Sequence, residues 1–80
     1  MDTSTAVRQR ILELCAQRGI TVNRLATRSG VTQSTVNNII SGRNHSATVA
    51  TIKKLCDGLG MSLADFFNAD CFNNLEQELR

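Results

Sequence analysis

The segment GVTQSTVNNIISGRN, residues 30–44, holds the decisive pattern of this 80-residue chain. Its apolar residues Val36, Ile39 and Ile40 recur at the spacing of one helical face, which predicts a helix that packs on the rest of the protein. Every other residue from 32 to 41 carries an amide or a hydroxyl, and none is charged. Solvent-facing helices usually contain Glu and Lys, which propagate a helix better than Asn, Ser and Thr do. The polar face of this helix therefore serves a purpose other than helix stability.

The residues before this helix complete a pair of short helices. Thr21 can cap a helix over 22–29, Gly30 ends it, and Thr32 caps the helix that follows. Ala26 is small enough for the two helices to cross closely, and Gly30 tolerates the positive φ that the turn requires. Two short helices joined by about three residues that include a glycine form a helix-turn-helix motif.

The remaining sequence predicts three more helices and an all-α, compact five-helix fold. The first helix begins near Thr3–Thr5, whose hydroxyls suit an N-cap, and ends at Gly19. The fourth begins at Thr48 and ends before Gly60, and the fifth opens with the capping box SLAD, residues 62–65. The apolar positions that recur at helical spacing in these three helices are Val7, Ile11, Leu14, Cys15, Val49, Ile52, Leu55, Cys56, Leu59, Leu63, Phe66 and Phe67.

The length of the chain allows one hydrophobic core, so we expect one domain over 1–68 and a C-terminal tail over 69–80. Phe72, Leu75 and Leu79 recur at helical spacing in this tail and predict a short amphipathic helix. Because a five-helix core is complete without this stripe, the stripe is free to form a dimer contact with a second copy. In the alternative arrangement it folds back onto its own core.

Charge is distributed unevenly along the chain. The net charge is only +2, yet the stretch between Glu13 and Asp57 contains no acidic residue. The basic residues of that stretch are Arg18, Arg24, Arg28, Arg43, Lys53 and Lys54. From Asp57 onward the chain contains five acidic residues and a single basic residue, Arg80. A solvated surface can acquire such a bias by chance, but a basic binding face explains it better.

Several functional classes find no support in the sequence. The three cysteines form no close pair, and His45 is the only histidine, so no metal site, disulfide framework or cofactor is expected. Cys15 and Cys56 are expected to be small buried hydrophobes. We see no paired carboxylates, no nucleophile with a base and no room for a small-molecule pocket, so the protein is not expected to be an enzyme. No apolar run approaches ~18 residues and no signal peptide is recognisable, so we expect a cytoplasmic protein without membrane contact.

Residues 7–68 resemble the lambda-repressor-like DNA-binding domain, also called the Xre or Cro/C1 type. The segment GVTQSTVNNIISGRN resembles the turn, the recognition helix and the following loop of that family. The segment TVATIKKLCDGLGMSLADFF, residues 48–67, resembles the family's fourth and fifth helices. The resemblance implies that the helix over 32–41 enters the major groove of DNA, with its N-terminal residues at base edges.

The resemblance also explains the uncharged face of that helix. Gln and Asn can bond adenine bidentately, Ser and Thr can bond either way, and carboxylates would repel the phosphates. By resemblance, the residues expected to read bases are Gln33, Ser34, Asn37, Asn38 and Asn44. The residues expected to contact phosphates are Thr21, Asn23, Arg24, Arg28, Thr35, Ser41 and Arg43. Plain solvation is the alternative for Arg24 and Arg28, and it is also the alternative for Gln33, Ser34, Asn37 and Asn38.

Two positions depart from the family pattern. Family members often carry Gln at the position of Val22, where it contacts phosphate and supports the first glutamine of the recognition helix. Valine does neither, which puts in doubt how rigidly Gln33 is held. The second departure is Ser29, where an apolar residue is usual.

The sequence therefore predicts a sequence-specific double-stranded DNA-binding transcriptional regulator of bacterial or phage origin, expected to act as a repressor. By resemblance it binds a palindromic operator as a homodimer. The alternative is a protein–protein adaptor, or an antitoxin-like module that binds a partner protein and keeps the helix-turn-helix fold. The sequence does not distinguish among regulators of mobile elements, antitoxins and restriction-modification controllers.

Overall fold

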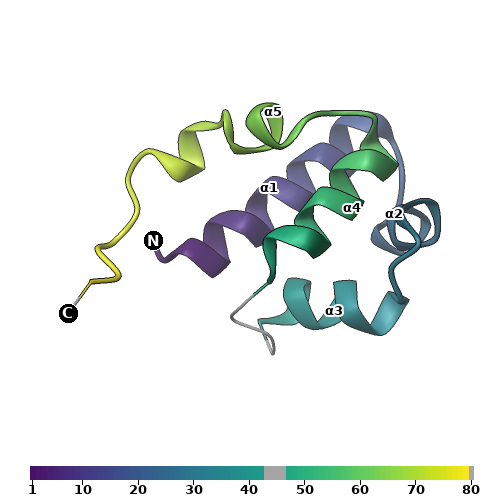
Figure 1. The fold of residues 1–80 in the computed structure, drawn as a ribbon, viewed down its shortest axis with the longest axis horizontal. Helices are drawn as coiled ribbons and strands as arrows, with labels where there is room; N and C mark the ends of the chain where they lie inside the picture. Colours follow the sequence, from purple (N-terminus) through teal and green to yellow (C-terminus); the bar gives the residue numbers. More distant parts are fainter. Residues whose placement is uncertain (43–46, 80) are drawn as a thin grey trace.

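The computed structural model describes residues 1–42 and 47–79 and shows a small bundle of helices (Figure 1). The elements in chain order are α1 (Thr3–Arg18), α2 (Val22–Ser29), α3 (Gln33–Ser41), α4 (Val49–Leu59), α5 (Leu63–Phe67) and the 3-10 turn η1 (Asp70–Phe72). The described residues contain no strand, so the predicted all-α, five-helix fold is confirmed. No helix among them is both long and apolar enough to span a membrane.

Local capping sets the ends of the helices. Thr21, Thr32, Thr48 and Ser62 each accept the backbone N–H three residues later, as the sequence predicts. The first helix differs from the prediction: its cap is the carboxylate of Asp2, which accepts the N–H of Thr5 at 2.8 Å. A carboxylate is a strong N-cap and its charge suits the positive end of the helix, so Asp2 takes the place predicted for the threonine hydroxyls.

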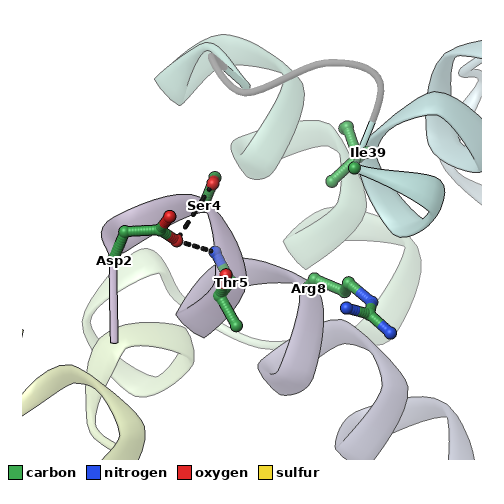
Figure 2. A pocket seen from close by; sticks show the side chains of 6 residues that line it. Asp2, Ser4, Thr5, Arg8 and Ile39 are labelled. Atoms are coloured by element: carbon green, nitrogen blue, oxygen red, sulfur yellow. Dashed lines mark hydrogen bonds between the residues drawn. The ribbon is translucent and has the colours of Figure 1, made fainter.

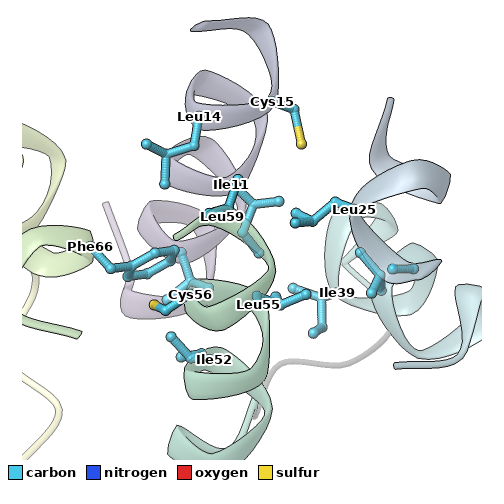
Figure 3. Close-up of a cluster of buried hydrophobic side chains, with 13 residues drawn as sticks. Ile11, Leu14, Cys15, Leu25, Ile39, Ile52, Leu55, Cys56, Leu59 and Phe66 are labelled. Atoms are coloured by element: carbon cyan, nitrogen blue, oxygen red, sulfur yellow. The ribbon is translucent and has the colours of Figure 1, made fainter. Parts of the chain in front are cut away.

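One apolar cluster joins α1 to α5 (Figure 3). The largest fully buried side chains are Phe66, Ile11, Leu14, Leu25, Leu55, Val36 and Cys56. Cys15 and Cys56 are buried as predicted, and burial raises the pKa of both thiols. Val49 was predicted to face inward and is 64% exposed, so this prediction is wrong. Val49 is the first residue of α4, and the buried residues of this helix begin one turn later at Ile52.

Arg10 is a buried charge inside this fold, and its side chain is only 10% exposed. Its Nε donates to the carbonyl of Phe66 at 2.7 Å and its Nη2 to the carbonyl of Asp65 at 2.8 Å. Its third partner is the carboxylate of Glu13. The two carbonyls belong to the last turn of α5, where the carbonyl of Asp65 also accepts the N–H of Asn68 at 3.2 Å. Arg10 therefore holds α5 against α1.

The tail folds back over the start of α1 instead of forming the predicted helix, which is reduced to the turn η1. The ring of Phe72 packs against Phe67, with centroids 4.9 Å apart, and Phe72 belongs to the partly buried rim of the core. The N–H of Glu76 donates to the carbonyl of Met1 at 3.0 Å. Leu79 is 80% exposed. Phe72, Leu75 and Leu79 thus do not form one free stripe, because Phe72 is used by the core.

Candidate nucleic-acid interface

The turn between α2 and α3 has the geometry that the sequence predicts. Gly30 has a positive φ of 66°, and the N–H of Val31 closes the turn on the carbonyl of Ala26 at 3.1 Å. Ala26 is fully buried, as expected where two helices cross. Val36 and Ile39 are buried on the inner side of α3. The opposite, polar side of α3 therefore faces the solvent.

The residues predicted to read bases are not equally accessible on that outer side. Gln33, Ser34 and Asn37 are exposed, whereas Asn38 is half-buried. The backbone carbonyl of Asn38 also accepts the hydroxyl of Ser41 at 3.3 Å. The fourth predicted residue on this helix is therefore less available to a ligand than its neighbour Asn37.

Thr35, predicted to contact phosphate, is occupied within the first turn of α3. Its hydroxyl lies 2.7 Å from the hydroxyl of Thr32, and its N–H donates to the same Thr32 oxygen at 3.3 Å. The side chain is half-buried. The structure therefore assigns Thr35 first to the helix cap.

An open pocket of about 300 Å³ lies where the outer face of α2 meets the start of α3. Its lining residues are Asn23, Arg24, Thr27, Arg28 and Gln33. The structure thus brings three predicted phosphate-contacting residues together with the first predicted base-reading residue. Thr27 was not predicted; its hydroxyl donates to the carbonyl of Asn23 at 3.1 Å. Its spacing of four residues from Asn23 is the signal that could have placed it on this face.

The start of α2 presents a positive helix end to the same surface. The hydroxyl of Thr21 accepts the N–H of Arg24 at 3.0 Å, and the first turn contains no acidic residue. Such a helix end attracts anions, and the two arginines one turn apart add full charges. Val22 is half-buried against the core. This departure from the family pattern therefore serves packing, and a polar support for Gln33 is absent at that position.

The second departure, Ser29, is explained by the helix behind it. A Cβ atom added to Gly58 of α4 would lie 2.1 Å from the Ser29 hydroxyl oxygen. A larger side chain at position 29 would therefore collide with α4. The hydroxyl is buried, and among the described residues it is the buried side-chain polar atom without a hydrogen-bond partner.

Other predicted residues add less to this surface. Ser41 is exposed at the end of α3. Lys53 pairs with Asp57 on α4, so part of the basic bias is compensated locally. Arg43 and Asn44, predicted to contact phosphate and to read a base, lie outside the described residues. Within the described residues, no group of three or more His, Cys, Asp and Glu side chains could hold a metal ion.

Fold and surface together define a helix-turn-helix protein. Residues 10–71 match the family model of the Cro/C1-type HTH DNA-binding domain. The chain therefore belongs to this family of DNA-binding domains, as the resemblance in the sequence predicted.

Solved structures agree with this assignment. The prophage Lp1 protein 11 is 41% identical, with a TM-score of 0.81; the match covers 94% of this chain and all of that one. An HTH_3 family transcriptional regulator from Vibrio cholerae is 28% identical, with a TM-score of 0.75. That match covers 85% of this chain and 38% of the regulator. No curated protein matches the chain.

Proposed function

We propose that this protein binds double-stranded DNA sequence-specifically, with α3 in the major groove, and represses transcription from the sites it occupies. The observation that carries the proposal is the outer face of α3, which is exposed, polar and uncharged. An arginine-lined pocket meets this face at Gln33. Base edges need neutral donors and acceptors, and phosphates need cations.

Base reading is assigned to Gln33, Ser34 and Asn37, because these side chains are exposed on successive positions of one face. The amides of Gln33 and Asn37 suit adenine, and the Ser34 hydroxyl suits any base. Asn38 is half-buried, so it presents less of its side chain to a base than these three residues do.

Phosphate contacts are assigned to residues of α2, which lie across the pocket from Gln33 of α3. Arg24 and Arg28 stand one turn apart and are exposed, and Asn23 and Thr21 lie at the positive end of the same helix. These groups donate hydrogen bonds and carry or border positive charge, which is what a phosphate accepts. Ser41 provides a further hydroxyl at the far end of α3.

Two copies of the protein are proposed to read a palindromic operator as a homodimer. A single nine-residue recognition helix covers too few base pairs to select one site in a genome. A two-fold dimer would place the two copies of α3 about 34–36 Å apart, one helical turn of DNA. In the tail, Leu79 and Leu75 remain available for the dimer contact, whereas Phe72 does not.

Selection from a random duplex library tests the whole proposal. We expect enrichment of a palindromic sequence, bound with an affinity that falls as salt rises by a slope of about −0.9 per phosphate contact. Enrichment of no sequence, together with binding that ignores salt, would favour the partner-binding alternative. A Leu79→Ser variant tests the dimer contact: sedimentation should show weaker self-association at unchanged helix content.

The similarity to a prophage protein supports a bacterial or phage origin for the chain. Repression then requires only that the bound protein occupies DNA that the transcription machinery needs, in the cytoplasm where that DNA lies. A reporter gene placed behind the selected sequence tests this part. Reduced expression is expected when the protein is present, and raised expression would reverse the assignment to activation.

A further inference from the structure

Each end of α3 lies beside a pocket to which another helix contributes an arginine. The pocket at the N-terminal end contains Arg24 and Arg28 of α2, described above. A smaller one, of about 60 Å³, lies at the C-terminal end, between α3 and the start of α1 (Figure 2). The residues lining it are Asp2, Ser4, Thr5, Arg8, Ile39 and Gly42. Arg8 is exposed on α1, outside the helix-turn-helix motif.

The distance between these two ends matches a dimension of DNA. The nine residues of α3 give a helix of about 13 Å, at about 1.5 Å per residue. The major groove is about 12 Å wide, with a phosphate backbone along each side. If α3 crosses the groove, groups at its two ends therefore come close to opposite backbones.

We propose that Arg8 contacts a DNA phosphate across the major groove from the backbone that Arg24 and Arg28 contact. The inference rests on the proposed function and extends it from α2 and α3 to α1. Arg8 carries a planar fork of donors that suits phosphate oxygens. Thr5, which lines the same pocket, adds a hydroxyl group. In this arrangement α1 and α2 hold the two sides of the groove while α3 reads it.

Asp2 works against this contact, and its chemistry offers an independent test. Its carboxylate lines the same pocket but accepts the N–H of Thr5 and, at 3.2 Å, the hydroxyl of Ser4. Figure 2 shows the guanidinium group of Arg8 on the other side of Thr5 from this carboxylate. The negative charge of Asp2 therefore weakens the contact between Arg8 and a phosphate but does not block it. Asn keeps the cap and removes the charge.

The first experiment measures binding of the full chain to random-sequence duplexes over a range of salt concentrations. The Arg8→Ala variant should lower the slope of log affinity against log salt by about 0.9, the value of one phosphate contact. Its deficit relative to the unmodified chain should shrink by about 3.5-fold for each fourfold rise in salt. Arg8→Lys should keep the slope and lose part of the affinity, because a point charge replaces the fork.

Lys53→Ala is the matched control, because it removes the same charge from a residue that pairs with Asp57 and lines neither pocket. An equal loss in Arg8→Ala and Lys53→Ala would show that net charge explains the effect, and this would overturn the inference. Binding by the unmodified chain without any loss in Arg8→Ala would overturn it as well, and would leave the proposed function standing. A failure of the unmodified chain to bind any duplex would overturn both.

The second experiment uses the charge of Asp2 and the position of the phosphates. Asp2→Asn should raise affinity about threefold at low salt, whereas Asp70→Asn, the same change in the tail, should not. Phosphate-ethylation interference on the selected duplex should lose its signal on one side of the major groove in Arg8→Ala. In Arg24→Ala the signal should be lost on the other side. Loss at the same phosphates in both variants would contradict the assignment of opposite backbones.

Discussion

The α1–α5 side and the α2–α3 side of the molecule both carry arginine, in contrasting surroundings. Arg10 lies between α1 and α5, and its donors are satisfied by two carbonyls and a carboxylate. Arg24 and Arg28 line an open pocket, and neither pairs with an acidic group of the described residues. The comparison teaches that a positive charge in this sequence marks a binding surface only where the fold leaves its donors available.

Removing Arg10 should give the largest change in stability. Arg10→Ala would remove its hydrogen bonds to the carbonyls of Asp65 and Phe66 at the end of α5, at a cost of about 3 kcal/mol. Urea unfolding measures this loss. Arg10→Met, which keeps the apolar stem, should recover part of it. A loss below about 1 kcal/mol in Arg10→Ala would break the comparison, since Arg10 would then resemble a solvated arginine.

Removing Gln33 should have the opposite effect: it should weaken DNA binding and leave the stability of the fold nearly unchanged. Gln33→Ala should leave the free energy of unfolding within about 0.5 kcal/mol, because the side chain is exposed. Binding to the selected operator should weaken by about 2 kcal/mol, with relaxed preference at one base pair. Competition assays with operator variants measure the preference. Equal weakening on operator and random duplexes would show that Gln33 reads no base.

Filling the space behind α2 should affect the DNA-binding side through packing. Gly58→Ala would place a methyl group against the Ser29 hydroxyl and should destabilise the protein by about 1.5 kcal/mol. Ser29→Gly combined with Gly58→Ala should recover much of that loss, because the two side groups compete for one volume. Thermal melting of the single and double variants measures the coupling. Additive losses would mean that α2 and α4 separate easily.

The smallest expected effect is a pH dependence of the free energy of unfolding, caused by the buried cysteines of the core. Burial raises the pKa of the Cys15 and Cys56 thiols above their ordinary value of 9.0. The unfolded chain therefore ionises first, so this contribution is intact below about pH 9 and is lost as pH rises through the folded values. The loss should stay below about 1 kcal/mol up to about pH 9.5. Cys56→Ala should flatten the profile in urea unfolding, and an unchanged profile would exclude this thiol as the cause.

Most of the fold was predictable because its helices start and end by local rules. The capping hydroxyls at 21, 32, 48 and 62 and the positive-φ glycines at 19, 30, 42 and 60 are visible in the sequence and hold in the structure. Where contacts between distant segments decide, sequence reasoning was wrong for Val49 and left two arrangements open for Phe72. The exposure of Val49 and the packing of Phe72 depend on which side chains lie opposite.

Arg10 was missed although a signal existed. It stands at the same helical face as Val7, Ile11 and Leu14, where a charge is out of place unless it is paired. At the candidate DNA-binding site, some residues were predictable from the sequence and others were not. Exposure of Gln33, Ser34 and Asn37 follows from the apolar stripe on the other face of α3, whereas the half-burial of Asn38 depends on how α3 packs against the rest of the fold. Arg8 was not predicted, because contact between α1 and the end of α3 is long-range.

The close fit of Ser29 against Gly58 has a consequence for how relatives of this protein can diverge. A larger residue at position 29 requires that α4 recede, and a residue other than glycine at position 58 requires that α2 recede. The two positions share one volume, so a larger side chain at one requires a small one at the other, and the two positions are expected to covary among descendants of this chain. Because glycine at position 58 already has the smallest side chain, a mutational path toward the apolar residue usual at position 29 must begin with a shift between the two helices.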